Sequence, residues 1–166
     1  MRKMRLTVLT GVVVVFLFSV VTPIQAGPPK TDSGDFWYIG TGATERWAGC
    51  NLFLTITEIA EWKGTFTGWS EDAGKAVLHC NGNWSVNEIM TFEEVVVDGK
   101  SGGLILSIVG NLPAGVLEWY GHWVILEGTG DLANLRGQGN WYGPGAAGPG
   151  QWGLLNYDGK YHFEPN

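Results

Sequence analysis

Apolar and polar residues alternate in short runs along most of the chain beyond residue 34, and glycine-rich or polar breaks separate these runs. Alternation with a period of two is the pattern of a β-strand that covers one face. The run 52–62 places on one face Leu52, Leu54, Ile56, Glu58 and Ala60. The other predicted strands are 35–40, 65–70, 76–80, 84–97, 104–110, 119–127, 152–157 and 159–163, with 84–97 as one bent strand or two.

Turn-forming residues mark the breaks between the runs. Residues 98–103, D-G-K-S-G-G, are the clearest hairpin loop, and Asn81-Gly82 and Asp158-Gly159 are expected to form tight turns. Segments rich in residues that interrupt strands are expected to be loops. These segments are 40–46, 71–74, 111–115 and 143–150.

The segment 119–142, W-Y-G-H-W-V-I-L-E-G-T-G-D-L-A-N-L-R-G-Q-G-N-W-Y, combines two aromatic strands with a Gly-Thr-Gly turn. The glycines permit backbone conformations with positive φ that a side chain resists. One short helical turn should follow at 131–135, with its aspartate capping the amides and two leucines plugging one end of a core. The residues that carry this motif are Gly128, Gly130, Asp131, Leu132, Leu135 and Gly137.

Many short strands with regular turns predict an all-β fold, and the glycine-rich strands favour a barrel over a sandwich because closure requires strands that coil. We expect an antiparallel, closed barrel of roughly eight strands with one short helical turn between Asp131 and Leu135. A barrel of about this size is either filled by side chains or holds one small ligand.

The N-terminus has the features of a secretory signal peptide. Arg2, Lys3 and Arg5 precede the apolar run 6–21, and Ala26 ends a sequence that resembles a signal-peptidase site. This run is short for a membrane span, although a retained anchor is the alternative. We therefore expect a signal peptide at 1–26, a flexible linker at 27–34, a single barrel domain at 35–166, and a secreted, periplasmic or extracellular protein.

The charge of the mature chain limits its partners. Removing the leader removes three basic residues and leaves seven Lys and Arg against 16 Asp and Glu, a net charge of −9. Nucleic acids and anionic membranes are bound by clustered basic residues, so neither is an expected partner.

Cys50 and Cys80 are the two cysteines of the chain. In an exported protein they most simply form one disulfide, which would contribute about 3 kcal/mol by closing the loop between them. Two free buried thiols are the alternative. A zinc site would need more ligands than His79 beside Cys80 supplies, so no metal and no cofactor are expected.

Two stretches resemble a known superfamily. Residues 123–139, W-V-I-L-E-G-T-G-D-L-A-N-L-R-G-Q-G, resemble the glycine-hairpin element shared by allene-oxide-cyclase-like barrels and dirigent proteins. Residues 90–110, M-T-F-E-E-V-V-V-D-G-K-S-G-G-L-I-L-S-I-V-G, are most similar to the uncharacterised, mainly bacterial members. The resemblance covers roughly 92–142.

The resemblance implies an eight-stranded barrel with a cavity open at one end. Members of the superfamily bind apolar small molecules and steer a cyclisation or a radical coupling, and some are trimers. Their pocket carboxylates lie mostly in the N-terminal half, where this chain does not align with them residue by residue. No catalytic residue is therefore carried over.

Glu94 is one candidate for acid–base chemistry. Glu94 and Glu88 share a predicted strand face with Met90 and Phe92, and Glu93 lies on the opposite face. If the shared face points into the barrel, burial would raise the pKa of a carboxyl there and suit it to transfer protons. The alternative is that these acids face water.

His122 is the other candidate for a general base. It shares a face with Glu118, but four residues along a strand separate the two by roughly 13 Å, too far for a direct acid–base pair. The alternative is a histidine that points outward into solvent.

The aromatic residues of the central segment are candidates for a ligand-binding surface. Tyr and Trp at a barrel mouth provide a platform for a flat apolar molecule or a sugar ring. Core packing of Trp119 and its neighbours across strands is the alternative. The ligand-binding candidates are Tyr120, Trp123, Trp141 and Tyr142.

Three hypotheses for function follow. The first is an exported barrel that binds a small apolar or aromatic molecule without chemistry of its own. The second is a cofactor-free cyclase or isomerase, or a dirigent-type steering protein. The third is a structural or surface-interaction protein with a filled barrel. A homo-oligomer is possible in each case.

Overall fold

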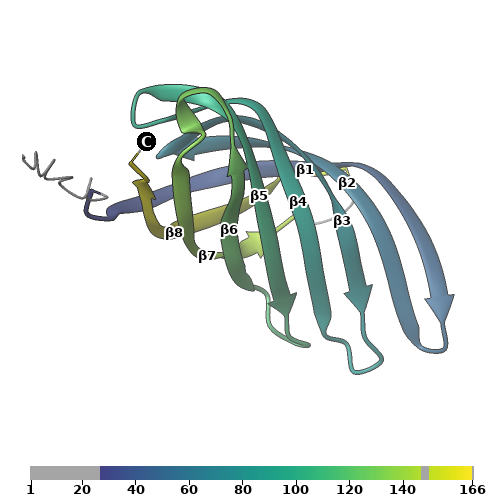
Figure 1. The fold of residues 1–166 in the computed structure, drawn as a ribbon. Helices are drawn as coiled ribbons and strands as arrows, with labels where there is room; N and C mark the ends of the chain where they lie inside the picture. The colour runs from purple at the N-terminus through teal and green to yellow at the C-terminus, as the bar shows by residue number, and fades with distance from the viewer. Residues whose placement is uncertain (1–26, 147–149, 166) are drawn as a thin grey trace, which may run out of the picture.

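A computed structural model describes residues 27–146 and 150–165; the predicted signal peptide lies outside this part of the chain. Eight strands form one antiparallel sheet in chain order, and β8 pairs with β1 to close it into a barrel (Figure 1). The elements are β1 (Lys30–Ala48), β2 (Asn51–Gly64), β3 (Phe66–Leu78), β4 (Trp84–Val97), β5 (Lys100–Leu112), β6 (Trp119–Gly128), the 3-10 turn η1 (Gly130–Leu132), β7 (Leu135–Gly145) and β8 (Gly153–Phe163). The predicted all-β barrel is confirmed. Within the described residues, no helix is long and apolar enough to cross a membrane.

The first half of β1 closes the barrel by pairing with β8, and its second half continues beyond the end of that pairing. Residues 30–38 pair with β8, whereas the pairing with β2 continues to Ala48. Residues 39–48 therefore pair with β2 and not with β8, and the β1–β2 hairpin lies at the lower right of Figure 1. Trp47, in this part of β1, is 58% exposed.

Aromatic side chains fill one half of the barrel. Trp62 stacks on Phe36 with ring centroids 4.3 Å apart and meets Phe92 edge to face at 5.6 Å. Phe66 stacks on Tyr157 and meets Trp123 edge to face, each at 5.6 Å. Stacked and edge-to-face ring pairs at these distances are favourable arrangements, so this half is a packed core.

Two leucines close the filled end. Leu132 in η1 and Leu135 at the start of β7 are fully buried, as the Gly-Thr-Gly motif predicts. The predicted capping by Asp131 is wrong. Thr129 is the N-cap residue and makes no side-chain cap, and its hydroxyl accepts a hydrogen bond from the Gly103 amide at 3.0 Å. The turn also ends at Leu132 rather than Leu135.

Tryptophan and glycine alternate along the inner face of β6, and glycine and tryptophan alternate along the inner face of β7. Each tryptophan on one strand therefore lies directly opposite a glycine on the neighbouring strand. A Cβ on Gly121 would collide with the ring of Trp141, and one on Gly139 would collide with Trp123. The small residues thus leave the space that the indoles occupy. The pairs are Trp119 with Gly143, Gly121 with Trp141, and Trp123 with Gly139.

Several predicted breaks are paired strand instead. β1 begins at Lys30, within the predicted linker, and continues through the predicted loop 40–46. β3 runs unbroken through 71–74, and β8 runs unbroken through Asp158-Gly159. In each case a long hairpin ladder satisfies the backbone of residues that on their own favour turns. Residues 143–145, expected in a loop, belong to β7.

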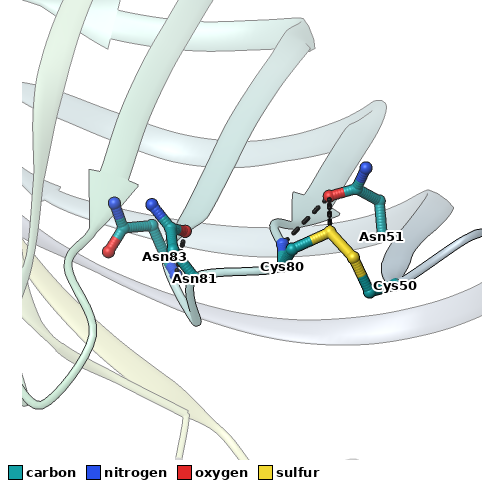
Figure 2. Close-up of a disulfide and its surroundings, with 5 residues drawn as sticks. All are labelled: Cys50, Asn51, Cys80, Asn81 and Asn83. Carbon is teal, nitrogen blue, oxygen red and sulfur yellow. Dashed lines mark hydrogen bonds between the residues drawn. A yellow bond between two sulfur atoms is a disulfide. The ribbon is translucent and has the colours of Figure 1, made fainter.

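The Cys50–Cys80 disulfide joins two hairpin turns at the end of the barrel opposite the leucines. Cys50 lies in the β1–β2 turn and Cys80 follows β3, with their Cα atoms 5.0 Å apart, and the predicted pairing is confirmed. Figure 2 shows Asn51 beside the bridge, where its side-chain oxygen accepts a hydrogen bond from the Cys80 amide at 3.0 Å. Asn83, also in Figure 2, accepts one from the Ala114 amide in the β5–β6 loop at 2.9 Å. Three loops at this end are thus tied together.

Candidate functional site: a carboxyl cluster in the barrel cavity

The half of the barrel nearest the disulfide is hollow. A cavity of about 220 Å³ lies between the inner faces of the strands. Its walls are mainly apolar, with no Lys or Arg among the described residues that line it. The aromatic lining residues are Phe36, Tyr38, Trp84, Trp119 and Trp141, and the aliphatic ones include Leu54, Ile56, Val86, Ile108 and Leu155.

Three carboxyl groups meet where the hollow half joins the packed core. Glu58 of β2, Asp72 of β3 and Glu88 of β4 each place a carboxylate oxygen within 4.8 Å of the other two. Glu58 and Glu88 line the cavity, and Asp72 completes the group from the neighbouring strand. We call these three residues the carboxyl cluster.

Strand register brings the cluster together. Glu58 lies directly opposite Asp72 on adjacent strands, and both side chains point inward. Glu88 is paired with Gly74, two residues from Asp72 along β3. A Cβ on Gly74 would collide with the Glu88 side chain, so the glycine provides the space over which that side chain lies.

Two members of the cluster are buried and Glu58 is half-buried, and the hydrogen bonding of the cluster is incomplete. Asp72 is 3% exposed and Glu88 is 4% exposed. Neither carboxylate oxygen of Asp72 has a hydrogen-bond partner of normal geometry. The Ser70 hydroxyl interacts with the Asp72 carboxyl and also accepts a hydrogen bond from the Trp62 indole at 3.1 Å. Burying an ionised carboxylate without partners costs free energy. These groups are therefore stabilised either by protonation or by a positively charged partner.

Burial raises the pKa of each carboxyl in the cluster. It raises the pKa of Asp72 to about 7, with smaller contributions from the nearby acids Glu58 and Glu71 and a partial offset from Ser70. It raises the pKa of Glu58 to about 7 and, together with the charges of Glu58 and Asp72, that of Glu88 to about 8. Near neutral pH the cluster therefore holds both protonated and ionised carboxyls, which is the condition for donating and accepting protons.

Tyr38 lines the same cavity. Its oxygen accepts a hydrogen bond from the Ala146 amide at 2.9 Å, and burial raises the pKa of the phenol to about 12. Tyr38 therefore keeps its proton under ordinary conditions and offers the cavity a neutral hydrogen-bond donor.

Glu94 lies on the outer surface, so the expectation that it shares a face with Glu88 is wrong. A β-bulge interrupts the pairing of β4 with β5 between Phe92 and Val95. A bulge adds one residue to a strand and reverses which positions point inward beyond it. Consequently Glu88 and Phe92 are buried before the bulge and Val95 is buried after it, whereas Glu94 is exposed.

His122 and two of the predicted ligand-binding aromatics also lie on the outer surface. His122 is exposed, as the alternative interpretation has it, and Tyr120 and Tyr142 are 53% and 44% exposed. Trp123 points inward but belongs to the packed core, where its indole donates a hydrogen bond to the Asp158 carbonyl at 3.0 Å. Trp141 lines the cavity.

Neither acid–base candidate from the sequence, Glu94 or His122, belongs to the cluster, and Glu58 and Asp72 do not appear in the sequence analysis of acid–base chemistry at all. Glu58 has a visible signal, because it falls on the apolar face of its predicted strand. Asp72 has none, since its surroundings, E-D-A-G, are typical of a turn. Its inward position depends on pairing with β2 and β4, which local sequence does not encode.

Another buried carboxyl, Asp32 of β1, lies apart from the cavity lining. It is fully buried opposite Gly159 of β8, and neither oxygen has a hydrogen-bond partner of normal geometry. Burial raises the pKa of Asp32 to about 6, despite a partial offset from the Thr65 hydroxyl and the Ser33 amide.

Solved structures share this fold. A protein of unknown function from the DUF3224 family of Shewanella oneidensis MR-1 superposes with a TM-score of 0.60 at 19% identity, covering 84% of this chain and 100% of that chain. A pterocarpan synthase dirigent protein superposes with a TM-score of 0.51 at 15% identity, covering 90% of this chain and 100% of that chain. No protein-family model and no curated protein matches the sequence. The chain therefore has a dirigent-like fold, as its glycine-hairpin element predicts.

Proposed function

We propose that this protein is an exported barrel that binds a small, mainly apolar molecule in its cavity, with the carboxyl cluster contacting a polar group of that molecule. The observation that carries the proposal is the cavity of about 220 Å³ with apolar walls and a carboxyl group at its inner end. Binding sites of this kind combine hydrophobic walls with a few convergent polar groups that fix orientation.

The size of the cavity restricts the ligand. Sites for drug-sized molecules measure roughly 300–1,000 Å³, so a cavity of about 220 Å³ fits a smaller molecule, such as one with a single ring. The tryptophans at 84, 119 and 141 supply flat surfaces against which such a ring would stack. A filled structural barrel is less well supported, because the core occupies half of the interior.

The test uses two matched variants on β3. Ala76 lines the cavity, and Ala73 is exposed on the opposite face of the same strand. Ala76→Phe should fill the cavity and lower ligand affinity at least tenfold, whereas Ala73→Phe should leave it within about twofold. The ligand is first identified by mass spectrometry of small molecules released from the folded wild-type protein. Equal retention of that molecule by both variants would place binding outside the cavity.

A second candidate function, a cofactor-free isomerase, cyclase or dirigent-type steering protein, is favoured by the raised pKa values of the carboxyl cluster. A protonated carboxyl there would donate a proton to the bound molecule while an ionised neighbour removes one from it, which leaves its composition unchanged. In D2O, such chemistry would introduce deuterium at carbon in the released ligand. Glu88→Gln should abolish this exchange, and exchange that persists would argue against proton transfer by the cluster.

Export is also part of the proposal. A disulfide is typical of oxidising compartments, and residues 1–26 have the pattern of a leader. Intact-mass analysis of the protein from its native source should give a chain that starts at Gly27. A chain that retains Met1 in the cytoplasm would contradict export.

A further inference from the structure

The carboxyl cluster lacks a positive partner in its surroundings. Three acidic side chains meet inside the barrel, with Asp72 and Glu88 buried and Glu58 half-buried, and no Lys or Arg belongs to the described residues of the cavity wall. Asp72 is almost completely buried and has no hydrogen-bond partner of normal geometry for either oxygen. Buried carboxylates are normally paired with a cation or fully hydrogen-bonded, so this arrangement is complete only with a cationic ligand or with added protons.

The three carboxyl groups lie close enough together to bind a single ammonium group. A primary ammonium group has three N–H donors in a tetrahedral arrangement, and charge-assisted hydrogen bonds measure roughly 2.8 Å from nitrogen to oxygen. Three acceptors at that distance lie about 4.6 Å from one another by this geometry. One oxygen each of Glu58, Asp72 and Glu88 lies within 4.8 Å of the others.

We propose that the ligand of the cavity is a primary amine, whose ammonium group binds among Glu58, Asp72 and Glu88 and whose apolar body extends toward Trp84 and Trp119. The inference rests on the proposed binding function and adds the chemical class of the ligand. The inference also excludes anionic ligands, because carboxylates at the inner end of the cavity would repel them.

The rest of the cavity favours an organic cation over a metal ion. Calcium takes six to eight oxygen ligands, and magnesium requires six in octahedral geometry. Apart from the two glutamates, Tyr38 is the one described lining residue that has a side-chain oxygen. The remaining lining side chains are aliphatic or aromatic. Aromatic faces attract an organic cation and pack against its apolar body. The chain's formal net charge of −6 also attracts cations in general.

The experiment compares three probes that share one ring and differ in charge: 2-phenylethylamine, 2-phenylethanol and phenylacetate. Binding to the oxidised, full mature chain is measured by calorimetry at pH 8 and low salt. We expect the amine to bind at least tenfold more tightly than the alcohol, and phenylacetate to bind most weakly.

Two variants locate the effect. Asp72→Asn should weaken amine binding at least tenfold and leave the affinity for the alcohol within about twofold. Glu94→Gln removes the same charge from the outer surface and should change neither affinity. Equal loss of amine affinity in both variants would show that general attraction, rather than the cluster, binds the amine, and would overturn the inference.

The remaining outcomes separate this inference from the proposed function. If the alcohol binds as tightly as the amine and Ala76→Phe weakens both, the cavity binds small molecules but the amine class is overturned. If none of the three probes binds, the amine class and the proposed small-molecule function both fail. If calcium or manganese chloride binds in a manner that depends on Asp72 and the amine does not, the site is a metal site and the inference is overturned.

Discussion

At the scale of single residues, the chemistry depends on which acids point inward. Glu88 and Glu94 are separated by an even number of positions, so regular alternation places them on one face, and a single bulge separates them. The sequence pattern indicated an inward position for Glu58, because it falls on the apolar face of its predicted strand. It gave no such indication for Asp72, which lies in a segment with the composition of a turn. The composition of each strand could be predicted, but the meeting of three carboxyls depends on pairing between strands, which the sequence pattern does not specify.

The buried acids make stability depend on pH in an unusual direction. In the folded state, the pKa values of Asp32, Glu58, Asp72 and Glu88 are raised above their ordinary values, to about 6, 7, 7 and 8. The folded chain therefore binds protons more tightly than the unfolded chain, and its stability falls as pH rises from about 4 to about 8. Thermal unfolding of the ligand-free protein should show a higher Tm at pH 5.5 than at pH 8.5. A Tm that rises over this interval would contradict the assignment.

Removing one buried charge should reduce this dependence. Asp72→Asn should stabilise the protein at pH 8.5 by about 2 kcal/mol, since one unit of pKa corresponds to about 1.4 kcal/mol and the amide retains part of the cost of burial. The same variant should gain little at pH 5.5. Denaturant unfolding at both pH values measures the difference, with Glu94→Gln as the exposed control.

At the scale of elements, the glycine-hairpin segment was the most predictable part of the chain. Its G-T-G turn, its short helical turn and its two buried leucines are all present, although Thr129 replaces Asp131 as the N-cap residue. The least predictable elements were β1, β3 and β8, which continue through residues with turn propensity. Ladders on both sides maintain the strand conformation of these segments in β3 and β8, and the ladder with β2 maintains residues 40–46 of β1. This tertiary effect overrides local preference.

The leucine plug should contribute strongly to stability. Leu132→Ala removes a fully buried side chain and leaves a cavity, so it should lower the free energy of unfolding by about 3 kcal/mol. Leu126→Ala is the matched control, because Leu126 is 53% exposed and should change stability by less than about 0.5 kcal/mol. Urea unfolding of both variants measures the contrast. Equal effects would mean that η1 does not close the core.

At the scale of the whole molecule, the barrel has one packed end and one end at which covalent and hydrogen-bonded ties join the loops. The disulfide connects the β1–β2 and β3–β4 turns, and Asn83 connects the latter to the β5–β6 loop. The cavity lies in this half of the barrel, so the disulfide and the hydrogen bond connect the loops around the least packed part of the interior.

Reduction of the disulfide should therefore lower the Tm. The bridge spans a sequence separation of 30, for which chain entropy alone predicts a stabilisation of about 3 kcal/mol. The oxidised mature chain should have a mass about 2 Da below the reduced form, and a variant with both cysteines changed to serine should melt at the temperature of the reduced protein. An identical Tm with and without reductant would argue against a structural bridge.

The opposite phase of tryptophan and glycine on β6 and β7 has a consequence for how the chain reaches this fold. If the two strands slipped by one residue, Trp141 would turn outward. If they slipped by two, Trp141 would meet Trp119 or Trp123, and glycine would meet glycine, which combines steric overlap with empty space. Misaligned hairpins are thus penalised at several points at once. The alternating bulky and small side chains therefore favour the native register of β6 and β7 while the barrel closes.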